Sequence, residues 1–133
     1  MNITRASCDS RSAGKEDRIE IENPVWEDIE AMIRSLDGES RTLVTFGNEE
    51  EGCYMAVGGG NGKYIAYISY DDGDQIHNLI QPDAHTEGWV ELIVGGQRGR
   101  FPANTCVSQE MVQLAARWFF DTQEAEPSLH WAE

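Results

Sequence analysis

The sequence has few cysteines, few basic residues and no long apolar run, and each shortage excludes a class of protein. Its 133 residues include only three cysteines, Cys8, Cys53 and Cys106. They are far apart and odd in number, and none forms a CxxC pair. A disulfide-stapled secreted domain or a thiolate zinc site would need paired, closely spaced cysteines. We therefore expect free thiols and a cytoplasmic location.

No stretch is long and apolar enough to cross a bilayer, and residues 1–15 lack the apolar run of a signal peptide. We therefore expect no association with membranes. The length suits one domain built around one core. Residues 1–16 are small, polar and charged, which predicts a disordered N-terminal tail followed by a single domain at residues 17–133.

Basic side chains are scarce: ten lysines and arginines stand against 24 aspartates and glutamates, a formal net charge of −14. Such a surface repels nucleic acid and attracts a basic protein partner. Between residues 42 and 97 the imbalance is stronger, since Lys63 is the only basic residue among nine acidic ones, a balance of −8. The charge pattern predicts an acidic binding surface in the middle of the chain.

Two segments carry helical periodicity. Residues 24–37 follow Asn23-Pro24, a helix start, and end before Gly38. Residues 108–121 begin at Ser108, a capping residue, and are apolar on most of the helix surface. We expect this second helix to be the core element, with Trp118 and Phe119 almost wholly buried.

The remaining pattern is that of strands and turns. We expect a short edge strand at 18–22, strands at 41–46, 53–57, 64–70 and 89–94 in one sheet, and a short strand at 105–107. We expect little regular structure at residues 75–88. Leu129 and Trp131 should fold back onto the core. The fold class expected is α+β: an antiparallel β-meander with two helices packed on one face.

Catalytic and metal-binding motifs do not fit this sequence. The glycine run at 58–62 before Lys63 lacks the first glycine and the final Ser or Thr of a phosphate loop, and it predicts a hairpin turn instead. His77 and His85 lie in one predicted loop without metal-ligand spacing or a nearby cysteine. We expect no enzyme activity, no metal and no cofactor.

Two predicted turns gather most of the central carboxylates. Charge runs in turns are commonly only solvated surface, which is the competing interpretation. An acidic rim on a rigid sheet can also imitate a phosphate backbone and attract a basic cleft, with a nearby aromatic ring as the anchor. The candidate binding residues are Glu49, Glu50, Glu51, Tyr70, Asp71, Asp72 and Asp74.

Several short segments, taken in order, resemble an immunity-protein family. They are residues 54–59 (YMAVGG), 64–70 (YIAYISY), 94–97 (VGGQ), 101–102 (FP), 107–108 (VS), 115–119 (AARWF) and 129–131 (LHW). The resemblance runs from about residue 24 to residue 131. This family, the first of the numbered immunity families (Imm one), accompanies deaminase-type bacterial polymorphic toxins. Related chains often place Thr-Gly after the core helix, where this chain has Thr122 and Gln123.

This resemblance implies an inhibitor without catalysis, which binds a cognate toxin and keeps the toxin's active site from nucleic acid. We separately expect the chain to be a monomer. Nucleobase deaminases accept an extruded or single-stranded base in a pocket, and that pocket is flanked by basic surface. The family motifs do not identify contact residues, so the candidate site rests on charge position alone. Two other classes stay open: an acidic adaptor or DNA mimic not tied to a toxin, and a small enzyme that uses the loop histidines.

Overall fold

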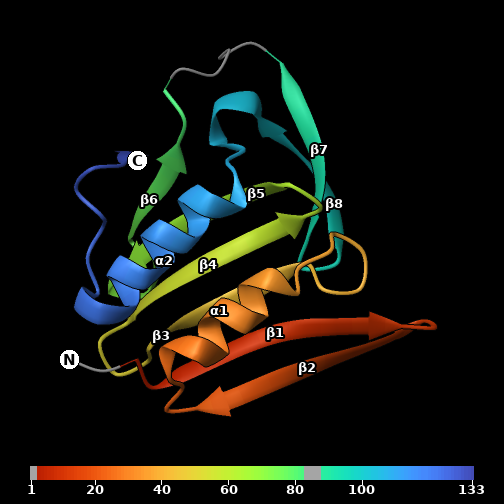
Figure 1. Ribbon diagram of the computed structural model, residues 1–133, viewed down its shortest axis with the longest axis horizontal. Helices are drawn as coiled ribbons and strands as arrows, with labels where there is room; N and C mark the ends of the chain where they lie inside the picture. The colour runs from red at the N-terminus through yellow and green to blue at the C-terminus, as the bar shows by residue number, and fades with distance from the viewer. Residues whose placement is uncertain (1–2, 83–87) are drawn as a thin grey trace.

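The main sheet is antiparallel throughout, with seven strands in the order β2-β1-β3-β4-β5-β6-β9 (Figure 1). The computed structural model describes residues 3–82 and 88–133. The strands of this sheet are β1 (Arg5–Ser12), β2 (Lys15–Glu22), β3 (Leu43–Asn48), β4 (Cys53–Gly60), β5 (Lys63–Tyr70), β6 (Gln75–Ile80) and β9 (His130–Ala132).

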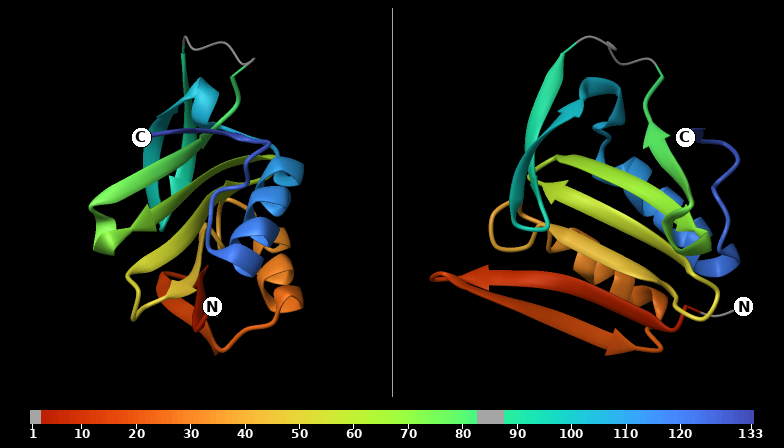
Figure 2. Two further views of the ribbon diagram at one scale, coloured as in Figure 1. Left: turned by 90° about the vertical axis from the view of Figure 1, so that its left-hand side faces the viewer. Right: turned by 180° about the vertical axis from the view of Figure 1, so that it is seen from behind.

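Helices α1 (Trp26–Arg34) and α2 (Gln109–Thr122) lie side by side on one face of the sheet (Figures 1 and 2). A separate hairpin, β7 (Trp89–Val94) and β8 (Gln97–Pro102), packs against part of the opposite face. Two short 3-10 turns, η1 (Asp71–Gly73) and η2 (Ala103–Thr105), complete the elements. The chain is therefore a single α+β domain, which confirms the expected fold class.

The core lies between the helices and the inward side chains of the strands. Phe119 of α2 is fully buried and meets Phe46 of β3 edge to face, with ring centroids 5.6 Å apart. The prediction for Phe119 is confirmed, but that for Trp118 is wrong, because Trp118 is 38% exposed. Leu114, one turn before Trp118, is 49% exposed. The helix lies on the sheet with no further layer above it, so its outer apolar residues face solvent.

The two helices begin differently from one another. Ser108 caps α2 as expected, because its hydroxyl accepts a hydrogen bond from the backbone N–H of Met111 at 3.2 Å. Helix α1 begins at Trp26, two residues later than Pro24. The Asp28 carboxylate accepts the backbone N–H of Val25 at 3.0 Å, so the first turn is capped by a residue inside the helix and not by Asn23.

Residues 5–12, expected to be disordered, form β1 in the interior of the sheet between β2 and β3. Ala6 and Cys8 are buried and lie opposite Phe46 and Val44 of β3. The prediction of a disordered tail is wrong. It rested on the polar and charged residues of this segment, which outnumber the few side chains that point into the core. Two small inward side chains and a hydrogen-bonded neighbour on each side are enough to hold a strand. The expected edge strand at 18–22 is confirmed as part of β2, which forms one edge of the sheet.

The strand at 89–94 does not belong to the main sheet as expected, because it pairs only with β8. Its partner β8, residues 97–102, was not predicted. The hairpin packs across the sheet at Gly58, where a Cβ atom would lie 2.6 Å from Val94. A bare glycine lets the second layer approach the sheet closely.

Two further segments differ from the prediction, and the C-terminal segment agrees with it. Residues 75–80, expected to lack regular structure, form β6 between β5 and β9. The expected strand at 105–107 is reduced to a single bridge between Val107 and Tyr64, which follows the η2 turn. The C-terminal prediction holds, since Leu129 and Trp131 pack against the core and β9 closes the sheet edge beside β6.

Replacing Phe119 with Ala should lower the free energy of unfolding by about 3–5 kcal/mol, because it leaves a cavity against Phe46. Leu114→Ala on the exposed side of the same helix is the control and should cost below about 1 kcal/mol. Urea denaturation of both variants measures the difference. Equal losses would contradict the assignment of the buried face of α2.

Placing a charge at Ala6 should lower the free energy of unfolding by about 3 kcal/mol or more, because Ala6→Asp buries an unpaired carboxylate. Ser12→Asp, at the exposed end of the same strand, should change stability by no more than about 0.5 kcal/mol. Thermal unfolding followed by circular dichroism compares the two. If both are silent, residues 5–12 do not form an interior strand.

Candidate functional site

The two predicted acidic turns lie side by side in the structure. One joins β3 to β4, and the other is η1 between β5 and β6. The backbone N–H of Asp72 donates to the carbonyl of Gly52 at 3.1 Å, and a Cβ atom on Gly52 would lie 2.7 Å from the Asp72 carboxylate. The turns therefore form one exposed surface, here named the acidic cluster. Its members are Glu49, Glu50, Glu51, Asp71, Asp72 and Asp74.

Two carboxylates of the acidic cluster are held by neighbours. Glu49 forms an ion pair with Arg5 at 3.1 Å, and Glu51 accepts a hydrogen bond from the Gln123 amide at 3.0 Å. The other four acidic side chains form no hydrogen bond or ion pair with another side chain in the part of the chain that the structure describes. Their carboxylates are available to a basic partner.

The backbone of η1 is strained where it presents these carboxylates. Asp71 and Asp72 have φ angles of 52° and 54°, in the left-handed region, and Gly73 follows at 101°. Aspartate tolerates this conformation better than most residues, although each such residue costs of order 1 kcal/mol or more. The hydrogen bond from Asp72 to Gly52 helps to keep the turn in this shape.

Tyr70 does not lie with the acidic cluster as an open aromatic anchor. Its hydroxyl donates to the backbone carbonyl of Gln123 at 3.1 Å, and its ring contacts His77 at 5.6 Å between centroids. Burial, Cys53 and Glu124 raise the pKa of Tyr70. Because side chains alternate along β5, Tyr70 points to the helix face of the sheet.

Gln123 connects the end of α2 to the acidic cluster. It ends the helix with a φ angle of 59°, the left-handed position where the resemblance implied glycine. Its side chain binds Glu51 and its carbonyl binds Tyr70, so one buried residue fixes both. The residue that departs from the family pattern thus positions the turn at 49–52.

The sheet face turned away from the helices holds an open basin of about 490 Å³ beside the acidic cluster. Tyr54 of β4 and Tyr67 of β5 lie in it with ring centroids 6.3 Å apart. Burial, with Tyr54 close by, raises the pKa of Tyr67 to about 12. Sequence reasoning missed both tyrosines, although the alternation of residues 64–70 places Tyr67 opposite the core-facing Ala66 and Ile68.

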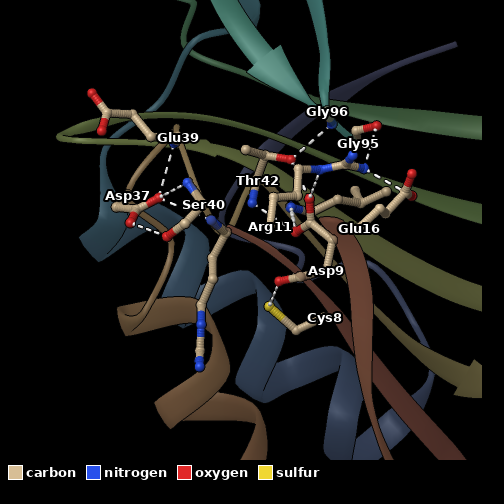
Figure 3. A network of polar contacts seen from close by, with 12 residues as sticks. Cys8, Asp9, Arg11, Glu16, Asp37, Glu39, Ser40, Thr42, Gly95 and Gly96 are labelled. Atoms are coloured by element: carbon tan, nitrogen blue, oxygen red, sulfur yellow. Dashed lines mark hydrogen bonds and ion pairs between the residues drawn. The ribbon is translucent and has the colours of Figure 1, made fainter. Parts of the chain in front are cut away.

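A buried carboxylate holds the hairpin to the sheet (Figure 3). Asp9 of β1 accepts hydrogen bonds from the Thr42 backbone N–H at 2.7 Å, the Thr42 hydroxyl at 2.5 Å and the Leu43 N–H at 2.9 Å. The Thr42 hydroxyl in turn accepts the Gly96 N–H of the hairpin turn at 2.9 Å. Arg11 bridges Asp9 and the Gly95 carbonyl, each at 2.9 Å.

Opposing effects set the pKa of Asp9. Burial raises it, but the hydrogen bonds from Thr42, Leu43 and Arg11 outweigh burial, and the pKa lies below its usual 3.8. A hydrogen-bonded carboxylate of this kind is stabilising while it stays ionised.

Those residues considered for catalysis that the structure describes are not gathered into a site. His77 lies in β6 against Tyr70, while His85 falls outside the described residues. Two of the nine acidic residues counted between residues 42 and 97, Asp83 and Glu87, also fall outside them. Within residues 3–82 and 88–133, no group of three or more metal-ligating side chains is found. Cys8 and Cys53 are free and buried, and burial raises the pKa of Cys53 to about 11, so its thiol is poorly nucleophilic.

The chain is thus a single α+β domain that carries an exposed acidic cluster with an open basin beside it. Residues 17–133 match the family described as Immunity protein Imm1, and the chain belongs to this non-enzymatic family. No curated protein matches the chain. As an immunity protein, it has a cognate toxin as its partner. The family match begins after β1, so a strand in the interior of the sheet lies outside it.

Among the described residues, no helix is both long and apolar enough to cross a bilayer.

Replacing Asp9 with Asn should lower the free energy of unfolding at pH 7 by about 1.5–3 kcal/mol, because it weakens several charge-assisted hydrogen bonds at once. Since the folded-state pKa of Asp9 lies below the usual 3.8, the stabilisation is present above that value and is lost as the pH falls through the lowered pKa. The difference between parent and variant should therefore shrink in acid.

Urea denaturation at pH 7 and near pH 3 measures this difference. The control is Glu16→Gln, which removes only the exposed partner of Arg11 and should cost below about 1 kcal/mol. A gap between Asp9→Asn and the parent that stays constant with pH would contradict the role given to the ionised carboxylate.

Proposed function

We propose that this immunity protein neutralises a nucleic-acid deaminase toxin in the cytoplasm of the producing cell, by covering the toxin's basic nucleic-acid cleft with the acidic cluster. The observation that carries the proposal is the arrangement of six exposed carboxylates on two adjacent turns, four of them without a side-chain partner in the described chain. The deaminase class of the toxin rests on the family resemblance seen in the sequence.

The chemistry of the toxin supports a basic target. An enzyme that acts on a base must hold the neighbouring phosphates with lysine and arginine. Carboxylates at comparable positions compete for the same cations and block the approach of nucleic acid. A turn that is already rigid loses little conformational entropy on binding, and the strained η1 turn is hydrogen-bonded to its neighbour before any partner arrives.

Family membership favours this function over the adaptor and enzyme alternatives, because it ties the chain to a toxin and to a non-enzymatic role. A stable complex should bury about 1,200–2,000 Å² in total. An area of that size extends beyond the two turns onto the open sheet face. We expect the inhibitor to act as a monomer.

Reversing Asp71, Asp72 and Asp74 to Lys should slow association with the toxin about tenfold or more at low salt, because exposed charge steers the encounter. The difference in association rate between variant and parent should fall as salt rises, because the screening length shortens to about 8–10 Å near physiological ionic strength. Stopped-flow association with the toxin encoded by the neighbouring gene provides the measurement.

The matched control reverses three exposed acidic residues on other elements, Asp17, Glu39 and Glu110, and changes the net charge equally. It should slow association much less. If both triple variants bind equally fast, net charge alone steers the encounter and the acidic cluster is only a solvated surface.

A further inference from the structure

The basin on the open sheet face exists because its floor is built from small side chains. Ser7 and Thr45 lie opposite one another there, with their hydroxyl oxygens 2.8 Å apart. Gly47 is the next open-face position on β3, and a Cβ atom there would lie 2.5 Å from the Cβ of Tyr54. No side chain at position 47 could fill this space without moving β4. The hollow of about 490 Å³ is therefore a consequence of the strand sequence.

The wall of the basin nearest the acidic cluster combines aromatic rings with carboxylates. Tyr54 and Tyr67 meet nearly edge to face, with an angle of 69° between their planes, and both are half-buried. Asp72 and Glu49 line the same basin at the end where the two turns meet. Electron-rich ring faces beside carboxylates form an environment that suits a guanidinium group, which stacks on the rings and donates to the oxygens.

Two tryptophans of this chain form cation–π contacts with arginines of the same chain. The guanidinium of Arg117 lies 5.2 Å from the ring centre of Trp26, and that of Arg100 lies 5.9 Å from the ring centre of Trp89. Within the described residues, no such contact is made to Tyr54 or Tyr67. Arg5 and Arg18 line the basin, but among the described residues neither makes a cation–π contact with these two rings. The rings therefore remain open to a cation from a partner.

Arg5 lines the basin but neither stacks on the two tyrosines nor forms an ion pair with Asp72. It is held by Glu49 at 3.1 Å and by Glu22 at 4.0 Å, on the side where β1 and β2 lie. The Asp72 carboxylate keeps no side-chain partner among the described residues, which leaves negative charge beside the rings.

We infer that the tyrosine side of the basin receives an arginine side chain of the toxin, which stacks on Tyr54 and Tyr67 and pairs with Asp72. The inference rests on the proposed function, in which the acidic cluster approaches a basic cleft. It adds a division of roles, because exposed charge governs association whereas a desolvated anchor governs dissociation.

The first test measures dissociation of the complex with the toxin encoded by the neighbouring gene. Tyr54→Ala and Tyr67→Ala should each raise the dissociation rate about 10- to 100-fold and leave association nearly unchanged. The matched controls Tyr54→Phe and Tyr67→Phe keep the rings and should stay within about threefold of the parent. Thr45→Arg fills the basin from its own floor and should also speed dissociation, so it serves if an alanine variant fails to fold.

The second test needs no toxin. N-acetyl-argininamide, titrated into the protein and followed by NMR, should shift the ring resonances of Tyr54 and Tyr67 in a saturable manner. The citrulline analogue has the same shape without the charge and should not shift them. No shift, or equal shifts from both compounds, would overturn the inference.

The two tests separate the inference from the function it rests on. If the parent fails to bind the toxin, the proposed function is wrong, and the argininamide titration alone decides the basin. If the parent binds but the alanine and Thr45→Arg variants dissociate at the parent rate, the basin inference is wrong while the acidic cluster retains its role.

Discussion

The ionised carboxylate of Asp9 is the interaction on which the arrangement of the layers depends. An ionised group this deeply buried would be costly if unpaired, but the surrounding N–H, hydroxyl and guanidinium donors satisfy it. Through Thr42 and Arg11 it reaches Gly95 and Gly96, which hold the β7–β8 hairpin against the sheet. One side chain on β1 thus ties together two strands of the sheet and the second layer.

That hairpin covers one end of the open sheet face, and the acidic turns stand at another (Figure 2). The uncovered part between them is the basin. In the proposed complex, the carboxylates would accelerate the encounter through long-range attraction, while the tyrosines would slow release through short-range contact. These two contributions respond differently to salt, because screening weakens exposed charges much more than a desolvated contact.

The surface is also linked to the core. Phe119 anchors α2 to the sheet, and four residues later Gln123 ends the helix and holds Glu51 and Tyr70. The acidic turn at 49–52 is therefore fixed to the end of helix α2. Tyr70 contributes to this support, because its hydroxyl donates to the Gln123 carbonyl.

The sequence by itself predicted helices at 24–37 and 108–121 and strands at 41–46, 53–57 and 64–70, together with the acidic character of the two turns, because local periodicity, capping and turn chemistry encode these features. The structure has the same five elements with shifted ends, at 26–34, 109–122, 43–48, 53–60 and 63–70. It also indicated the family through the order of short motifs. These parts depend on neighbours a few residues away, which is why a pattern along the chain is enough to find them.

Only the tertiary structure decided what depends on distant neighbours. It made residues 5–12 an interior strand, because β2 and β3 pair with this segment on either side. The polar sequence of the segment gives no sign of these partners. It moved residues 89–94 out of the sheet, and it turned Tyr70 inward while leaving Tyr54 and Tyr67 on the open face. The face that a strand residue occupies is set by register and by what covers each side, and register is fixed only when the strands pair.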